Sequence, residues 1–140
     1  MRVLVILKAT RNSEAGAAPD PGELERMIRF NEEMTKAGIL KACDGLKPSK
    51  YGKRIKFRGH GKKSVTDGPF AETKELIAGY FLWEVKSMEE AMEWVNRFPD
   101  PAPGNEPEIE LRTFWELEDC DALTPGQRDR VDAMQRSVEA

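Results

Sequence analysis

The hydrophobic pattern predicts a first strand at Met1–Ala9, where five successive apolar residues run from Val3 to Leu7. The most strand-like segment is Glu75–Val85, which is apolar at nearly every position. Further strands are predicted at Ile39–Cys43, Arg54–Arg58, Lys63–Thr66 and Glu108–Leu117. In Arg54–Arg58, basic residues alternate with apolar ones, so we expect one face of this strand in water and one buried.

Capping residues and helical spacing of apolar side chains predict three helices. The first begins at Asp20, whose side chain can accept from free backbone amides, and ends at Gly38. The second follows a capping box at Ser87–Glu90, and the third begins at Thr124 with a narrow apolar stripe. Loops are expected at residues 10–19 and 100–107.

This order of elements predicts an α+β fold. A β-α-β-(hairpin)-β-α-β order is typical of a ferredoxin-like sandwich, in which two helices cover one face of an antiparallel sheet. We expect residues 1–117 to form this domain and residues 118–140 to form a C-terminal helical extension.

The predicted core strands have apolar side chains on both faces. Val3, Val5 and Leu7 lie on one face of the first strand, and Leu4 and Ile6 lie on the other. Two helices can cover only one face, so the second needs another cover. We therefore predict a homodimer in which two sheets pack face to face as a closed or nearly closed α+β barrel. The alternative is that the C-terminal helix covers this face alone.

Composition narrows the function classes. With 140 residues, a net charge of −3 and a pI near 5.4, the chain is expected to be a single domain that does not bind nucleic acid directly. The basic stretch from Lys50 to Lys63 is interpreted as a solvated hairpin face, with a polyanion site as the alternative. One histidine and two cysteines are too few for a zinc site, so no metal and no cofactor are expected.

The sequence predicts neither a membrane span nor a secretory leader. No apolar run approaches the roughly 20 residues that a span requires. The apolar run at Val3–Leu7 is too short for a secretory leader and is followed by Lys8. A cytoplasmic location with free thiols at Cys43 and Cys120 is the expectation.

The stretch Val65–Glu75 concentrates turn-forming and ionisable residues. Asp67, Gly68 and Pro69 predict a tight turn, and Phe70 can anchor it in apolar surroundings. Acidic and basic side chains follow within a few residues.

The segments Asp67–Glu75 and Gly79–Leu82 resemble the signature of the DGPF branch of the YCII-related proteins. Supporting matches fall at Phe30–Met34, Ala37–Gly38, Gly45–Pro48, Glu90–Trp94 and Glu108–Arg112. The resemblance extends to about Glu116 and implies a dimeric α+β barrel of ferredoxin-like subunits. The wider superfamily includes small lyases, isomerases and oxygenases of aromatic or lactone compounds, some without a cofactor. A His–Asp pair in the cleft has been proposed as catalytic in related proteins. This sequence departs from that pattern, because its one histidine, His60, falls in a predicted hairpin turn rather than on a core element.

Each candidate site residue could have either a functional role or a purely structural one. Asp67 could be a general base or a turn cap, and His60 a catalytic partner or an exposed turn residue. Glu72 and Lys74 could bind a polar ligand or pair with each other. Arg112 could clamp a carboxylate or pair with a nearby glutamate. Tyr80 could contact substrate, although a core or interface role is the simpler interpretation.

Two functions follow as hypotheses. In the first, the protein is a cofactor-independent lyase or isomerase that acts on a small anionic or aromatic molecule near the dimer interface, with Asp67 and either His60 or Arg112. In the second, it is a non-catalytic metabolite-binding or regulatory module. The resemblance adds a possible partner, because DGPF proteins are often encoded beside or fused to transcription sigma factors. A structural dimer without a ligand is the third possibility.

Overall fold

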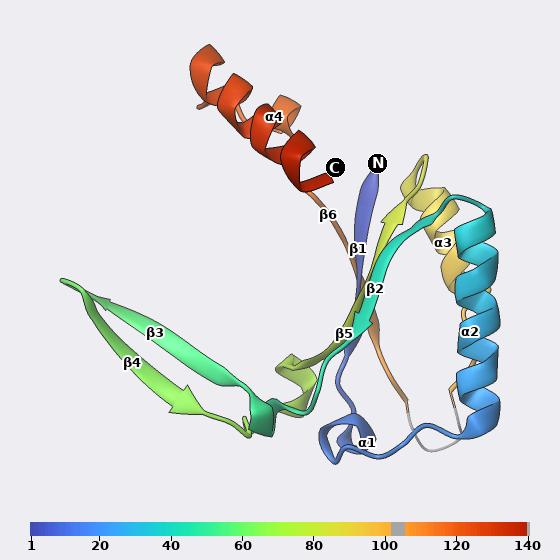
Figure 1. Cartoon of the computed structure of the whole chain (residues 1–140). Coiled ribbons are helices and arrows are strands. Elements are labelled where there is room, and N and C mark those ends of the chain that lie inside the picture. The colour runs from blue at the N-terminus through green and yellow to red at the C-terminus, as the bar shows by residue number, and fades with distance from the viewer. Residues whose placement is uncertain (102–105, 140) are drawn as a thin grey trace.

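The computed structural model describes residues 1–101 and 106–139, and its centre is a four-stranded antiparallel sheet (Figure 1). The strands lie in the order β2-β5-β1-β6. Their bounds are Leu40–Gly45 for β2, Ile77–Glu84 for β5, Arg2–Lys8 for β1 and Ile109–Thr113 for β6. The mixed α/β fold and its antiparallel sheet agree with the sequence prediction. Of the predicted loop 100–107, residues 102–105 lie outside the described chain.

Helices α2 (Pro21–Lys36) and α3 (Met88–Asn96) cover one face of this sheet. Asp20 accepts from the amides of Gly22 and Glu23, and Ser87 accepts from the amide of Glu90, so both predicted caps are confirmed. The helices bury a core that includes Val3, Val5, Phe30, Met34, Phe81, Trp83 and Trp94. Because Val3 pairs with Trp83 and Val5 with Phe81, this core lies on a single face of β1 and β5.

The opposite face of the sheet is not covered by α2 or α3, and we call it the open face. It presents Leu4, Ile6, Ala42, Asp44, Ala78, Tyr80, Leu82, Glu110 and Arg112. The central apolar side chain, Ile6, is only 9% exposed, and its neighbours Leu4, Tyr80 and Leu82 are half-buried. The open face therefore has an apolar centre with charged residues toward both edge strands, as the two-sided strand pattern predicted.

A separate two-stranded hairpin consists of β3 (Lys53–Gly59) and β4 (Lys62–Asp67). The predicted alternation is present, but the expectation that one hairpin face is buried is wrong for the isolated chain. Ile55 and Val65, which pair across the strands, are 49% and 60% exposed, and Phe57 is 74% exposed. The apolar side chains of the hairpin remain exposed because the hairpin makes little contact with the four-stranded sheet.

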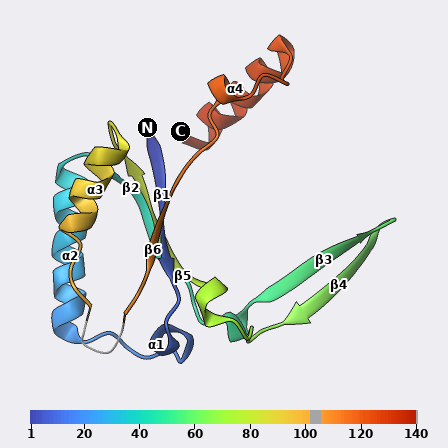
Figure 2. The same ribbon diagram turned by 180° about the vertical axis from the view of Figure 1, so that it is seen from behind.

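Both remaining large elements project on the open side of the sheet (Figures 1 and 2). Helix α4 (Pro125–Glu139) lies beyond the end of the sheet at which the chain begins, and the hairpin extends from the other end. The apolar residues Met134 and Val138 of α4 are 60% and 86% exposed. The C-terminal helix therefore leaves most of the open face uncovered within one chain.

Short helical turns occur outside the predicted helices, and two of them include Glu75 and Leu117, which were predicted as the first and last residues of strands. Helix α1 (Arg11–Glu14) follows β1, and the 3-10 turns η1 (Ser49–Tyr51) and η2 (Thr73–Glu75) flank the hairpin. A third such turn, η3 (Leu117–Asp119), leads into α4.

Candidate functional site

The segment Asp67–Glu75, which we call the signature loop, is held by a network that begins in α1. Both carboxylate oxygens of Glu14 accept from Ser49, one from its backbone amide at 2.9 Å and one from its hydroxyl at 2.6 Å. The backbone amide of Phe70 donates to the same Ser49 hydroxyl oxygen at 3.0 Å. Three segments that are distant in the sequence are thus joined, and the network fixes the base of the hairpin beside the end of β1.

Gly68 completes this packing. Its amide donates to the carbonyl oxygen of Gly52 at 3.0 Å, and its Cα lies against the backbone of η1. A Cβ at this position would lie 1.8 Å from the carbonyl oxygen of Ser49, so no side chain fits there. The Gly of the signature is therefore required by a close approach of two backbones.

A cavity of about 510 Å³ opens beside this network, and we call it the signature pocket. Its walls come from η1, the start of the hairpin, the signature loop and the start of β5. The lining residues are Glu14, Leu46, Lys47, Pro48, Ser49, Tyr51, Gly52, Arg54, Phe70, Glu75, Leu76 and Ile77. The lining is mostly apolar, with a small number of charged groups, as is typical of sites for small molecules.

Cations and aromatic rings are paired in this pocket. The Arg54 guanidinium lies 4.0 Å from the centre of the Phe70 ring, and the Lys47 ammonium lies 5.2 Å from that of Tyr51. Within the described chain neither cation has a carboxylate partner, whereas both oxygens of Glu14 are bound by Ser49. The remaining carboxylate, Glu75, is exposed. The lining thus carries two positive and two negative groups, and the two cations, which form no ion pair among the described residues, lie beside aromatic surface.

Two predicted catalytic residues lie on the hairpin rather than in this pocket. Asp67 is 75% exposed at its side chain and forms a 2.6 Å ion pair with Lys53 on the paired strand. His60 occupies the hairpin tip, where it has a positive φ of 51° between Gly59 and Gly61, which also have positive φ. Strand β4 separates the two residues by about 20 Å, so a single chain does not bring them together.

The other predicted site residues are dispersed. Arg112 lies on the open face with a side chain that is 69% exposed and bonds Glu110 at 3.3 Å. Glu72 directly precedes η2 and Lys74 lies within it. Both are exposed, and neither has an ion-pair partner among the described residues. Helix and sheet geometry thus separate Arg112 from the signature loop within one chain.

Tyr80 lies on the open face beside the edge strand. Its hydroxyl donates to the Asp44 carboxylate at 3.2 Å. This hydrogen bond, together with the negative charge of Asp44, raises the pKa of Tyr80 above its ordinary value because it favours the neutral phenol. Tyr80 is therefore placed for an interface role more readily than for contact with a ligand in the signature pocket.

Sequence reasoning did not identify Glu14, Ser49 or Arg54 as site residues. Glu14 and Ser49 are 35 positions apart, and Ser49 and Phe70 are 21 apart, so no local spacing links them. Arg54 was one of several basic residues in the hairpin, and only its position over Phe70 distinguishes it.

Nowhere in residues 1–101 and 106–139 do three or more His, Cys, Asp or Glu side chains gather as a metal would require. In that same part of the chain, every helix is too short or too polar to cross a membrane.

Comparison with known proteins gives two findings. The family model described as "YCII-related domain" matches residues 1–114. An uncharacterized protein of Rhizobium meliloti is 31% identical over 85 residues, which cover 58% of this chain and 68% of that protein.

Proposed function

The chain belongs to the YCII-related domain family, and we propose that it is a homodimeric protein that binds a small anionic molecule with an aromatic or apolar part in the signature pocket. The observation that carries this proposal is the stacked pair of Arg54 and Phe70 in a mostly apolar cavity. A carboxylate or phosphate can bind the guanidinium through two parallel hydrogen bonds. The rings of Phe70 and Tyr51 can then contact a planar ligand.

The geometry favours binding over catalysis by the predicted His–Asp pair. Asp67 is solvent-exposed, paired with Lys53 at 2.6 Å, and does not line the signature pocket. His60 lies at the far end of β4 and would have to reach a site on a second chain. A cofactor-independent lyase or isomerase thus remains the second hypothesis, and it requires a histidine supplied by a partner subunit.

The open face supports the homodimer. Its apolar centre, formed by Leu4, Ile6 and Leu82, gains about 25 cal/mol for each Å² removed from water. Two copies that present the same face can cover each other symmetrically. The strand order with two helices on one side supports the ferredoxin-like interpretation, and such pairing would give the dimeric α+β barrel. We also propose that residues 118–140 are a separate extension.

Thermal stability in the presence of defined probes tests the ligand proposal. Benzoate and phenyl phosphate are the anionic aromatic probes, benzamide is the neutral counterpart of benzoate, and acetate lacks the ring. We expect the two anionic aromatic probes to raise the unfolding midpoint, with little effect from benzamide or acetate. Arg54→Gln should abolish the shift because the guanidinium is lost.

The matched control is Arg58→Gln, which removes a positive charge from the same strand and the same hairpin face. Arg58 bonds Ser64 and does not line the signature pocket. It should therefore leave the probe-induced shift unchanged. Equal shifts in the wild type and Arg54→Gln would contradict the assignment of the pocket, as would equal responses to benzoate and benzamide.

A further inference from the structure

Two segments of opposite charge flank the open face. Residues 53–63 of the hairpin contain six Lys or Arg and no acidic residue, whereas the chain as a whole has a net charge of −3. The other residues therefore carry a net charge of −9. Residues 116–121 contain four Asp or Glu and no basic residue. This acidic segment precedes α4, at the end of the sheet away from the hairpin.

The hairpin also exposes an unpaired apolar face. Ile55, Phe57 and Val65 alternate with the polar and basic positions and thus share one face. Their exposures of 49%, 74% and 60% leave a contiguous apolar surface in water. Lys56 and Arg58 project from the opposite face of β3. Such a hairpin needs packing against another surface for stability.

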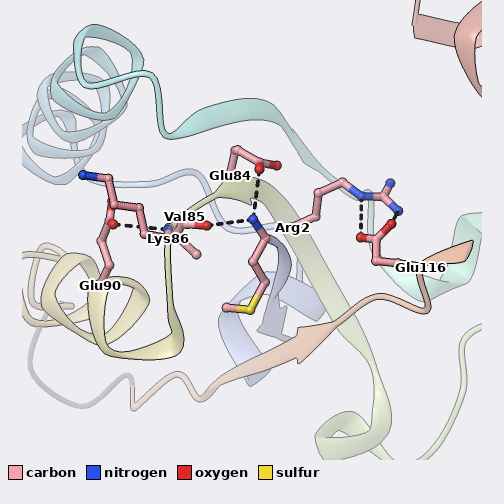
Figure 3. Close-up of polar contacts among 7 residues, drawn as sticks. Arg2, Glu84, Val85, Lys86, Glu90 and Glu116 are labelled. Atoms are coloured by element: carbon pink, nitrogen blue, oxygen red, sulfur yellow. Dashed lines mark hydrogen bonds and ion pairs between the residues drawn. The ribbon is translucent and has the colours of Figure 1, made fainter. Parts of the chain in front are cut away.

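The surface beneath α4 has matching properties. A cavity of about 690 Å³, which we call the α4 cavity, lies between α4 and the open face. Its apolar lining is provided by Leu82, Met134 and Val138. Arg2 also lines it and binds Glu116 through two hydrogen bonds of 3.1 Å, so the acidic segment borders the cavity (Figure 3).

We propose that in the homodimer the hairpin of each chain docks against the α4 end of the second copy. Its apolar face covers the α4 cavity. Lys63, which pairs with Phe57 on that same face, and Lys62 at the turn lie beside residues 116–121. This inference rests on the proposed homodimer and specifies how the two chains are arranged. The α4 cavity is then completed only by a segment of the other chain.

Symmetry and charge support this arrangement over the alternatives. A hairpin cannot reach the α4 cavity of its own chain, because the two lie at opposite ends of the sheet. A two-fold axis across the strands places the hairpin end of one sheet opposite the α4 end of the other. A two-fold axis along the strands places hairpin against hairpin. The six positive charges of one hairpin would then repel the six of the other.

A charge-exchange experiment tests the proposal. The double variant Lys62→Glu/Lys63→Glu reverses the charge of the hairpin residues that are expected to lie at the contact, and Glu118→Lys/Asp121→Lys reverses the charge of the acidic segment. Each alone should raise the dimer dissociation constant at least about tenfold at low salt, because attraction becomes repulsion. The variant with all four substitutions should return the constant to within about threefold of wild type. Sedimentation equilibrium measures all four proteins.

The control is Arg26→Glu/Lys36→Glu, which reverses two exposed charges on α2, behind the covered face of the sheet. It should leave the dissociation constant unchanged. A wild-type monomer would overturn the homodimer itself. A wild-type dimer that is indifferent to both reversals would overturn only the docking proposed here. Heparin retention that depends on Lys62 and Lys63, with unchanged dimerisation, would instead assign the hairpin to a polyanion.

Zero-length cross-linking gives a second test, which uses only the wild-type chain. A carbodiimide joins amines directly to carboxylates that they contact. In dimers mixed from isotopically light and heavy chains, we expect links between chains from Lys62 or Lys63 to residues within 116–121. Links from these lysines only within one chain, or none, would contradict the arrangement.

Discussion

Gly68 is the residue of the signature loop whose identity the backbone dictates most strictly. Because an added Cβ would lie 1.8 Å from the Ser49 carbonyl oxygen, Gly68→Ala must displace η1 or the hairpin base. We expect the free energy of unfolding to fall by about 2–3 kcal/mol, as for other overpacked sites. Urea denaturation followed by circular dichroism measures the change.

Gly45→Ala provides the matched comparison. Gly45 ends β2, has no neighbouring atom within 4 Å of an added Cβ and lacks a positive φ. It should change the free energy of unfolding by less than about 0.5 kcal/mol. If both substitutions lowered the free energy of unfolding equally, the close approach of the two backbones at Gly68 would not be the cause of the loss.

Tyr80 gives a prediction about pH. Its bond to Asp44 favours the neutral phenol, so its pKa lies above the ordinary value of 10.0. The stabilising contribution is complete below the ordinary pKa and is lost as the pH rises through the raised folded-state pKa. In a Tyr51→Phe background, Tyr80 is the only tyrosine, and its titration can be followed by tyrosinate absorbance.

Adding Asp44→Asn to this background removes both the charge and the carboxylate acceptor. The Tyr80 titration midpoint should then move down toward the ordinary value. An unchanged midpoint would mean that Asp44 does not control this phenol.

At the scale of elements, Ser49 couples α1, η1 and the signature loop. Ser49→Ala removes the acceptor of the Phe70 amide and one donor to Glu14. We expect a loss of about 1–2 kcal/mol in the free energy of unfolding, together with faster hydrogen exchange at the Phe70 amide. Ser64→Ala, in the exposed hairpin, should have little effect on either quantity. Slow exchange at Phe70 in Ser49→Ala would contradict the proposed network.

Elements with local signals were predicted well from the sequence. Asp20 and Ser87 marked the starts of α2 and α3, because an N-cap acts on amides only two or three positions away. Alternation correctly predicted the two strands of the hairpin but not their exposure, because burial depends on whatever packs against them. The four-residue helix α1 escaped prediction because it is too short to show an apolar period.

The candidate site was less predictable than the fold. Phe70 was predicted to anchor its loop in apolar surroundings, and in the structure the Arg54 guanidinium lies over its ring. Glu14 and Ser49 carry no local motif, since their contact arises only when the fold brings α1 beside η1. His60 and Asp67 are close in the sequence, but His60 lies in the hairpin turn and Asp67 ends β4. Because an extended strand rises about 3.3 Å per residue, the two side chains are far apart.

At the scale of the whole molecule, one chain has three unsatisfied apolar surfaces on the same side. They are the open face, the apolar face of the hairpin and the stripe of α4 that includes Met134 and Val138. A second copy of the chain can cover all three surfaces, so we expect the protein to be a dimer. Leu82 belongs to both the open face and the α4 cavity, so it tests the claim with one substitution.

Sedimentation velocity of the wild type and Leu82→Lys at micromolar concentration is the most direct measurement. We predict a dimer for the wild type and a folded monomer, or a dimer weakened at least about a hundredfold, for Leu82→Lys, since a charge would be buried in the apolar interface. Ile28→Lys, on an exposed position of α2, should remain dimeric. A wild-type chain that sediments as a monomer across this range would contradict the account.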